Sequence, residues 1–449
     1  MLSVQSTAKS FSRFEFIAGA AIIIALILFY FPFLSGQQSF FYTDTTFGLE
    51  PTCTFRHKEL TGGHFPLWNP LLYCGMSELA VPFPSLFYPP DYLLVVLPFN
   101  QGLALAMIFH QVLAAVSMFL LLKRWGLEKY SATTGGVIYS MSGYMFSLTA
   151  NYSLVAGAAW LPLCMFTLSN FQSVKDFENY KWCLLSSFSL AMLVLSGRPE
   201  VFVPSLAVIV AYVLSFRDKE NSFAYVLSWQ IRSFLLAFLF SAPAIFPTAE
   251  WLSQSRRATG MLGEEVFMFS ANWYDVVSIF WGQGLGNLRA IGTPFRSLVL
   301  ENNFPPFMSC AYVGPVSLVL ACIGAFAKWK YRAFTIAVLV LGLAFGLGKN
   351  LTLVSWVISV VPGLNFVRIP IKLFFLVTWA LSITAAYGVA ALENERAIRW
   401  GALTTCISLI ASLLLIYFTS ASVAVLPFMP TQAQAILLLR SKELHNRVF

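Results

Sequence analysis

The sequence predicts an all-α integral membrane protein with about eleven transmembrane helices, and its composition and hydropathy pattern support that prediction. Of its 449 residues, 58% are hydrophobic and only 11% are charged, whereas about 25% are charged in a typical soluble domain. A soluble protein of this composition would expose far too much apolar surface to water. Long apolar stretches separated by short polar connections complete the pattern. The composition therefore excludes a soluble enzyme, a disordered chain and a secreted disulfide scaffold.

The apolar stretches have the length that a bilayer requires. A helix needs roughly 20 apolar residues to cross a hydrocarbon core about 30 Å thick. The expected spans are 16–35, 101–122, 131–149, 153–171, 182–196, 201–216, 231–249, 309–327, 333–348, 371–392 and 400–420. The stretches 182–196 and 333–348 are short, so ten to twelve spans fit the pattern. No small-residue cleavage site follows the first stretch, so we interpret it as a helix and not as a removable signal.

The distribution of charge indicates the orientation in the membrane, and the spacing of the spans indicates the domain organisation. The net charge is +8, but the basic residues are scattered in short clusters, so we expect no nucleic-acid partner. With the N-terminus in the cytoplasm, the inner segments hold fifteen of the 28 Lys and Arg residues, as the positive-inside rule requires. We expect one polytopic domain over 1–420, with long outer loops at about 36–100 and 250–308, and a short outer tail at 421–449. Chemistry therefore belongs on the extracytoplasmic face.

Asp44 is the candidate base. It lies about ten residues beyond the first span, among hydroxyl and aromatic side chains. Desolvation at the mouth of an apolar cavity can raise the pKa of such a carboxylate and suit it to accept a proton. A solvated loop residue or a helix N-cap would give the same pattern.

The rest of the first outer loop predicts a rigid lid lying on the bilayer. It contains Gly-Gly-His-Phe-Pro-Leu-Trp-Asn-Pro at 62–70 and Pro-Phe-Pro-Ser-Leu-Phe-Tyr-Pro-Pro at 82–90. Proline fixes an irregular backbone, and tryptophan and tyrosine prefer the membrane interface. The candidate lid or acceptor contacts in this loop are Glu50, His64, Trp68 and Asn69.

Four arginines and one lysine are candidates for binding a phosphate or an anionic acceptor. Arg368 and Lys372 would share one helix face if the helix includes both, although interfacial snorkelling also explains them. Arg198 is on the same side, but Glu200 beside it can neutralise it. Arg256 and Arg257 belong to the second long loop, where ordinary surface charge is the alternative.

The sequence contains no zinc-type ligand spacing, and we expect no required metal or other cofactor. A divalent ion held by oxygen ligands of the first outer loop remains an alternative. Cys53 and Cys74 share that loop and could pair if it faces an oxidising compartment. No phosphate-cradling glycine loop is present, which argues against direct use of a nucleotide sugar.

The run His-Phe-Pro-Leu-Trp-Asn-Pro at 64–70, with Gly75-Met76 and Phe-Tyr-Pro at 87–89, resembles the YfhO family of bacterial membrane proteins. Arg-Ile-Pro-Ile-Lys at 368–372 resembles another stretch of that family. Ser-Gly-Arg-Pro-Glu at 196–200 is similar to a third, with Arg and Glu in place of the family's His and Gln. Many members continue into a long extracytoplasmic region, so we expect a short member or one without its C-terminal part.

The resemblance implies a GT-C-like fold and a glycosyltransferase of the bacterial cytoplasmic (inner) membrane. Its donor would be a polyprenyl-phosphate-linked sugar, its acceptor an envelope glycan or glycopolymer, and its surroundings membrane lipids. Asp44 would remove a proton from the acceptor hydroxyl, and the sugar would transfer with inversion.

Two other functions remain open. A flippase or transporter of a lipid-linked saccharide would use the same cations but need no base. The expected spans hold charged residues only near their ends, which disfavours ion-coupled transport. A non-catalytic envelope assembly protein would tolerate replacement of Asp44, Arg368 and Lys372.

Overall fold

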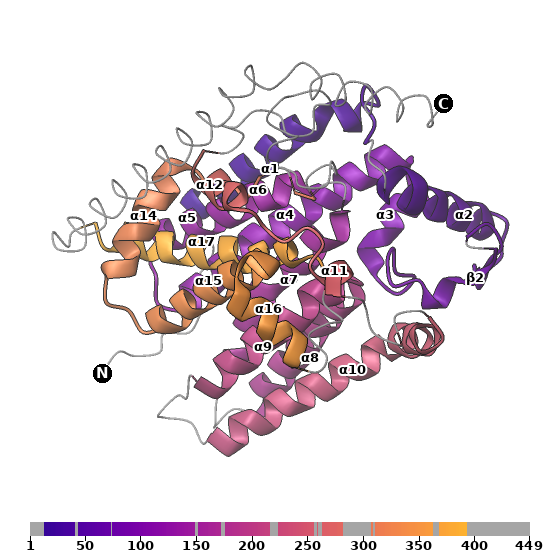
Figure 1. Cartoon of the computed structure of the whole chain (residues 1–449). Helices are drawn as coiled ribbons and strands as arrows, with labels where there is room; N and C mark the ends of the chain where they lie inside the picture. Colours follow the sequence, from indigo (N-terminus) through magenta and orange to yellow (C-terminus); the bar gives the residue numbers. More distant parts are fainter. Residues whose placement is uncertain are drawn as a thin grey trace, which may run out of the picture.

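The computed structural model describes residues 13–40, 44–72, 74–148, 151–171, 176–215, 223–255, 258, 263–281, 307–308, 310–361 and 368–392. The described chain is mostly helical (Figure 1). Its main helices are α1 (Arg13–Leu34), α4 (Phe99–Arg124), α5 (Lys129–Ser140), α7 (Tyr152–Leu168), α8 (Asp176–Leu195), α9 (Pro199–Ser215), α10 (Phe223–Ser253), α14 (Pro315–Phe326), α15 (Arg332–Leu347) and α17 (Phe374–Ala390). Nine of the ten expected spans before residue 393 thus each overlap one of these helices, and the span 131–149 overlaps α5 and a further short helix. The span 400–420 and the tail 421–449 lie outside the described residues.

Five of the described helices are long and apolar enough to cross a membrane, so the expected number of about eleven is not confirmed. They are Arg13–Leu34, Phe99–Arg124, Phe223–Ser253, Arg332–Asn350 and Pro370–Ala390. Three further apolar helices, α7, α9 and α14, have only 12 to 17 residues. At 1.5 Å per residue such helices are roughly 18–26 Å long, which is less than the hydrocarbon thickness.

The expected span 131–149 is two helices. After α5 the chain makes a turn at Met141 and Ser142 before the short helix α6 (Gly143–Ser147). The hydroxyl of Ser142 donates to the carbonyl oxygen of Tyr139 at 2.9 Å. Such side-chain bonds to the backbone compete with the helical ladder. At Gly143, the first residue of α6, a Cβ atom would overlap the backbone of Tyr312, so this close approach requires glycine.

The segment between α1 and α4 is a lobe, which we call the lid (residues 44–98). It comprises a π-helical turn η1 (Thr45–Leu49), α2 (Glu50–Thr61), β1 (Trp68–Asn69), β2 (Met76–Ser77), the 3₁₀ turns η2 (Glu78–Ala80) and η3 (Pro89–Asp91), and α3 (Tyr92–Val96). The two strands are antiparallel, with Trp68 opposite Ser77 and Asn69 opposite Met76. In Figure 1, α2 and β2 project to one side of the helical body. The remaining short elements are α11 (Gly263–Val266), α12 (Trp273–Trp281), η6 (Gly348–Asn350), α16 (Thr352–Val360) and η8 (Pro370–Leu373).

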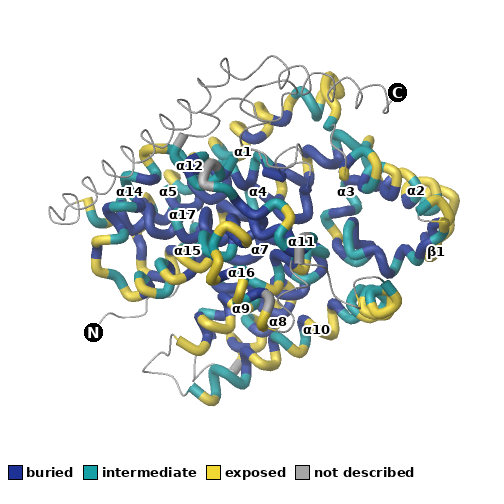
Figure 2. Tube along the Cα trace, viewed as in Figure 1, coloured by how far each residue is buried: buried dark blue, intermediate teal, exposed yellow. Residues whose placement is uncertain are grey.

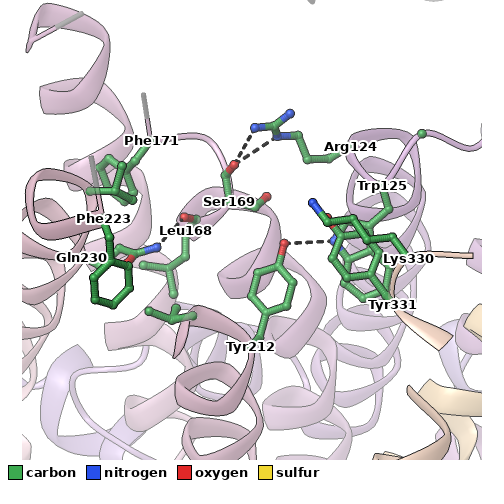
Figure 3. Close-up of a pocket in the computed structure, with 13 residues that line it drawn as sticks. Arg124, Trp125, Leu168, Ser169, Phe171, Tyr212, Phe223, Gln230, Lys330 and Tyr331 are labelled. Carbon is green, nitrogen blue, oxygen red and sulfur yellow. Dashed lines mark hydrogen bonds between the residues drawn. The ribbon is translucent and has the colours of Figure 1, made fainter. Parts of the chain in front are cut away.

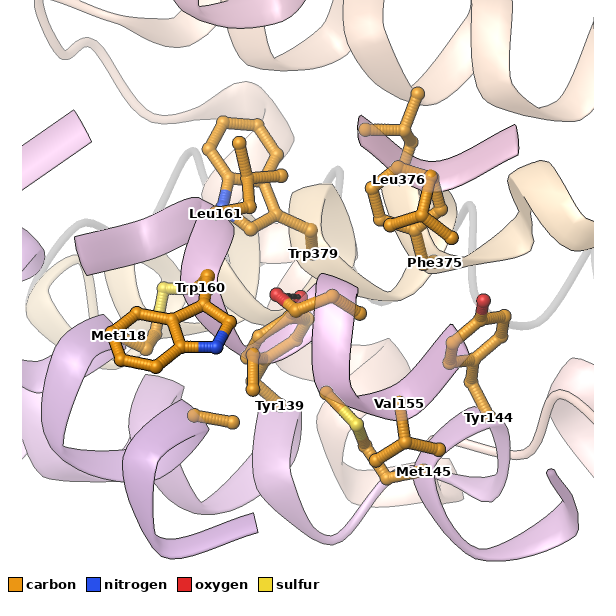
Figure 4. Packing of buried hydrophobic residues seen from close by; sticks show 14 of the residues in the cluster. Met118, Tyr139, Tyr144, Met145, Val155, Trp160, Leu161, Phe375, Leu376 and Trp379 are labelled. Atoms are coloured by element: carbon orange, nitrogen blue, oxygen red, sulfur yellow. Dashed lines mark hydrogen bonds between the residues drawn. The ribbon is translucent and has the colours of Figure 1, made fainter. Parts of the chain in front are cut away.

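The core lies among α4, α5, α7 and α17. Met118, Tyr139, Leu161 and Trp379 from these four helices are fully buried, and Figure 4 shows them packed with their neighbours. Figure 2 shows buried residues along α4, α7 and α17 and exposed ones along α10 and α2. The apolar side chains that α10 exposes are what a lipid-facing helix presents.

Two glycines bring α14 and α17 into backbone contact. A Cβ atom on Gly324 would overlap the carbonyl oxygen of Thr384, and one on Gly388 would overlap that of Leu320. Small residues allow helices to approach this closely in membranes, where the hydrophobic effect does not hold helices together.

The helices alternate in direction, which defines two ends of the bundle. The lid end contains the ends of α1, α8 and α10 and the beginnings of α4, α7, α9 and α17. There the hydroxyl of Thr248 in α10 donates to the carbonyl oxygen of Ala80 in the lid at 3.4 Å. At the opposite end, α4, α7, α9 and α14 end and α8, α10 and α15 begin. There the hydroxyl of Tyr387 in α17 donates to the carbonyl oxygen of Trp125, the residue after α4, at 3.2 Å.

Candidate active site

The segment Ser196–Glu200 connects α8 to α9 and lies directly against the lid. Gly197 has φ +82°, and a Cβ atom there would overlap the carbonyl oxygen of Pro82. Glycine is therefore required for two reasons, its backbone conformation and its close contact. The guanidinium carbon of Arg198 lies 5.2 Å from the ring centroid of Phe83 in the lid. Its Nε also donates to Ser153 Oγ at 2.6 Å, so α7 and the lid together position this cation.

Glu200 pairs with Lys372 and not with Arg198, which corrects the expectation from neighbouring positions. Lys372 Nζ lies 2.6 Å from Glu200 Oε1, and the two side chains are 3% and 8% exposed. Their separation of 172 positions in the sequence explains why the sequence alone does not indicate this pair. The ammonium group also lies 5.4 Å from the ring centroid of Phe307. A buried carboxylate is needed here because an unpaired buried ammonium would be strongly destabilising.

Arg368 and Lys372 do not share one helix face as expected. Ile369 between them has φ +64°, and the turn η8 begins only at Pro370. A proline disfavours the helical conformation of the residue before it, and a positive φ is strained for a β-branched side chain. The backbone N–H of Ile369 donates to the carbonyl oxygen of Val266 at 3.2 Å, which helps to hold this conformation. Backbone strain of this kind is often found at functional sites.

Arg198, Arg368, Lys372 and Glu200 form what we call the cationic cluster. The charges of Arg198 and Arg368 both act on the Lys372 ammonium, so three positive groups and one carboxylate lie together, with two net positive charges. The buried Nε of Arg368 has no hydrogen-bond partner among the described residues. Arg198 and Arg368 are both partly exposed. Guanidinium groups are the chemical kind that suits phosphate oxygens, and the cluster contains two of them.

Asp44 is exposed at the beginning of η1, and its side chain makes no capping hydrogen bond. It therefore occupies the N-cap position of η1 without a capping bond, and its exposure is also what a solvated loop residue would show. The π-helical turn that follows runs directly into α2, and such turns occur often at functional sites. Within the described part of the chain, no hydrogen bond or ion pair joins Asp44 to the cationic cluster, so its role as a base remains a prediction.

The other lid candidates have different environments. Glu50 is half-buried in the first turn of α2 and His64 is exposed. Trp68 is 59% exposed and Asn69 is 1% exposed. Gly75, at φ +118°, lies against the indole of Trp68, where a Cβ atom would overlap the ring. The lid thus exposes the indole of Trp68 and buries the side-chain amide of Asn69.

Sequence reasoning missed a buried ion pair that holds the lid together. Arg56 of α2 and Glu78 of η2 are 1% and 0% exposed at their side chains. The Nε and Nη2 atoms of Arg56 lie 2.7 and 2.6 Å from Glu78 Oε2, and the Asn69 amide donates to Glu78 Oε1 at 2.7 Å. In the sequence these residues look like ordinary charges of a polar loop.

Asp91 is a second buried carboxyl that sequence reasoning missed. Its Oδ1 accepts from the Tyr152 hydroxyl and its Oδ2 from the Ser85 backbone N–H, both at 2.8 Å. Burial raises the pKa of Asp91 to about 7, against the smaller opposing effects of these bonds and of Arg56. Because Tyr152 precedes Ser153, the partner of Arg198, this carboxyl joins the lid to the cationic cluster.

The remaining expectations concern two arginines, a possible disulfide and a metal site. Arg256 and Arg257 lie outside the described residues. Cys53 and Cys74 are free thiols, the first buried in α2 and the second exposed, so the possible disulfide is not formed. Among the described residues, no group of three or more His, Cys, Asp or Glu side chains is placed to hold a metal ion.

No family model matches the sequence, and no curated protein matches it. Solved structures do match in fold. Two structures of the arabinofuranosyltransferase AftD from Mycobacteria, both of one mutant, align with TM-scores of 0.53 and 0.51. The identities are 14% and 17%, over 93% and 91% of this chain. The chain spans only 28% of the length of AftD in both alignments. The fold of this membrane protein is therefore similar to part of a mycobacterial glycosyltransferase.

Proposed function

We propose that this protein is an inverting glycosyltransferase of the bacterial cytoplasmic membrane, with the GT-C-like fold and the YfhO-type motifs that its sequence resembles. It moves a sugar from a polyprenyl-phosphate-linked donor to an envelope glycan or glycopolymer on the extracytoplasmic face. The similarity of its fold to AftD, whose name is that of an arabinofuranosyltransferase, supports the class of reaction.

The observation that carries the proposal is the cationic cluster at the lid end. A departing lipid phosphate needs positive groups close to the membrane surface, beside a surface that accepts a lipid. Arg198 and Arg368 provide two partly exposed guanidinium groups, and the paired Lys372 adds the third cation. With the N-terminus in the cytoplasm, the alternation of helices brings the lid end to the outer face.

In the proposed reaction Asp44 accepts the proton of the acceptor hydroxyl. The acceptor oxygen then forms a bond to the anomeric carbon, while the bond between that carbon and the phosphate oxygen breaks. The electron pair of the broken bond leaves with the polyprenyl phosphate, whose charge the cationic cluster stabilises. Attack from the side opposite the phosphate inverts the anomeric configuration. The proposed steps need no metal or other cofactor.

Binding of polyprenyl phosphate to the purified protein, measured by native mass spectrometry, tests the role of the cluster. We expect Arg198→Gln and Arg368→Gln each to weaken binding by about tenfold, since a charge-assisted hydrogen bond contributes about 1.5–3 kcal/mol. Arg332→Gln, at the opposite end of the bundle, is the matched control and should bind as the wild type does. Equal affinities for all four proteins would remove the cluster from the proposal.

Glycan mass analysis of the cell envelope tests the reaction. A strain that lacks the protein should lose a sugar modification. Wild type should restore this modification, and Glu59→Ala, from the same loop, should restore it equally. Asp44→Ala at matched expression should not. Full restoration by Asp44→Ala would overturn the transferase and favour transport or assembly of a lipid-linked saccharide.

A further inference from the structure

A cavity of about 320 Å³ opens at the opposite end of the bundle, and none of the residues of the proposed reaction lines it. Its walls come from five connections and helix ends: the end of α4, the end of α7, the end of α9, the beginning of α10, and the connection between α14 and α15. The lining residues used below are Arg124, Trp125, Tyr212, Val226, Lys330 and Tyr331. Figure 3 shows the guanidinium of Arg124 and the ammonium of Lys330 above the ring of Tyr212 in that view.

The cavity is positively charged. Arg124 donates from Nε and Nη2 to the carbonyl oxygen of Ser169 at 3.1 and 2.7 Å, which fixes its position, and no described residue neutralises its charge. Lys330 lies over the ring of Tyr331, with 5.3 Å from Nζ to the ring centroid. No Asp or Glu is among the described residues that line the cavity, and neither cation has an ion pair there. An anion is the complementary ligand.

Aromatic rings give the cavity rigid walls. The rings of Trp125 and Tyr331 stack with centroids 4.2 Å apart and planes 22° apart. The indole N–H of Trp125 donates to the hydroxyl oxygen of Tyr212 at 3.2 Å. Tryptophan and tyrosine next to lysine and arginine are typical of the level where membrane helices meet lipid headgroups.

The helices beside the cavity have lipid-facing side chains in the adjacent turns. On α9, Val210 and Leu214 are 43% and 52% exposed, and on α10, Ile231 and Leu235 are 49% and 60% exposed. Both helices are apolar, and α10 is long enough to span a membrane. Acyl chains could pack along these turns while the headgroup occupies the cavity. A soluble phosphate compound would make no use of them.

We propose that this cavity binds the phosphate headgroup of an anionic phospholipid, at a site separate from the proposed reaction. Arg124 and Lys330 contact the phosphate, the aromatic walls enclose the glycerol part of the headgroup, and α9 and α10 carry the acyl chains.

The test is native mass spectrometry of the full-length protein titrated with phosphatidylglycerol, phosphatidylcholine or water-soluble glycerol 3-phosphate. We expect phosphatidylglycerol to bind more tightly than phosphatidylcholine. Lys330→Gln should weaken phosphatidylglycerol binding about fivefold, and Arg124→Gln with Lys330→Gln about 25-fold, since each cation near an anionic lipid contributes about 1 kcal/mol. Lys328→Gln removes an exposed charge from the same connection outside the cavity and should leave the affinity unchanged.

Val226→Trp keeps every charge but fills the cavity, so it distinguishes a cavity from a charged surface. It should weaken phosphatidylglycerol binding at least as much as Lys330→Gln does. Equal loss in Lys328→Gln and Lys330→Gln, or full affinity in Val226→Trp, would overturn the site. Binding of glycerol 3-phosphate as tight as that of phosphatidylglycerol would overturn the lipid as its ligand.

Discussion

Replacement of Glu78 by glutamine tests whether the buried ion pair holds the lid in its folded form. Both side chains of the pair are almost fully buried, and Glu78 accepts bonds from Arg56 and from the Asn69 amide. The variant leaves the Arg56 guanidinium buried without the carboxylate that it contacts, with Asp91 as the remaining acidic group whose charge it influences. Removing one partner of such a pair costs about 3–5 kcal/mol. We take the lower value, because the glutamine oxygen still accepts one bond.

Hydrogen exchange measures this loss locally. The backbone N–H of Glu78 donates to the carbonyl oxygen of Leu67 at 3.0 Å, and this bond must break when the lid opens. A loss of about 3 kcal/mol corresponds to roughly 100-fold faster exchange of protected lid amides. Lys58→Gln changes an exposed charge on α2 and should alter exchange by less than about threefold.

A double variant separates the charge effect from the loss of packing. Arg56→Met with Glu78→Leu removes both charges and keeps apolar volume, so it should recover part of the protection that Glu78→Gln loses, although the Asn69 amide then loses its acceptor. Protection in Glu78→Gln that matches Lys58→Gln would refute the reasoning. So would a double variant that exchanges as fast as Glu78→Gln.

Three further predictions concern the stability of the lid end, each measured by denaturant unfolding of the purified protein. Gly197→Ala should lower the free energy of unfolding by more than about 2 kcal/mol, through backbone strain and overlap. Gly36 also has a positive φ but lies in open space, so Gly36→Ala should lower the free energy of unfolding only by the strain of about 1 kcal/mol. Equal losses in the two variants would contradict the close contact at Gly197. Because burial raises the folded-state pKa of Asp91 from 3.8 to about 7, stability should fall by up to about 4 kcal/mol as pH rises from about 4 to 7, and Asp91→Asn should flatten that fall. Glu200→Gln should lower the free energy of unfolding by about 3–5 kcal/mol, because it leaves Lys372 unpaired. Adding Lys372→Met to this variant should restore much of that free energy. If it does not, the unpaired ammonium is not the cause of the lost stability.

The positions of the helices are readily predicted from the sequence because apolar composition and bilayer thickness restrict the choice strongly. The short helices α7, α9 and α14 show where this fails: hydropathy marks an apolar stretch but not the residue at which a helix ends. The Ser142 hydroxyl makes a side-chain bond at the interruption, and Gly143, which begins the next helix, contacts Tyr312, 169 positions away in the sequence. Hydropathy contains neither.

The sequence points to Arg198, Arg368 and Lys372 individually but not to the contacts that they make. The motif at 196–200 and the motif at 368–372 do meet, as the pair of Glu200 with Lys372 shows. The sequence places Arg198 next to Glu200 and therefore suggests the wrong pair. Arg56 and Asp91 could not be identified, because in a polar loop a charge that will be buried looks the same as one that stays in water.

The glycine contacts between α14 and α17 have a consequence for how the bundle can move. Because the two backbones touch at Gly324 and Gly388, any larger residue there would push the helices apart, and we expect the pair to move as one rigid body. Helix α17 begins at Phe374, two positions after Lys372, and Tyr387 near its end bonds to Trp125. Movement between helices of the bundle should therefore be easier at other contacts. Helix α10, whose apolar side chains are largely exposed and which contacts the lid at Ala80, is held less tightly by the bundle.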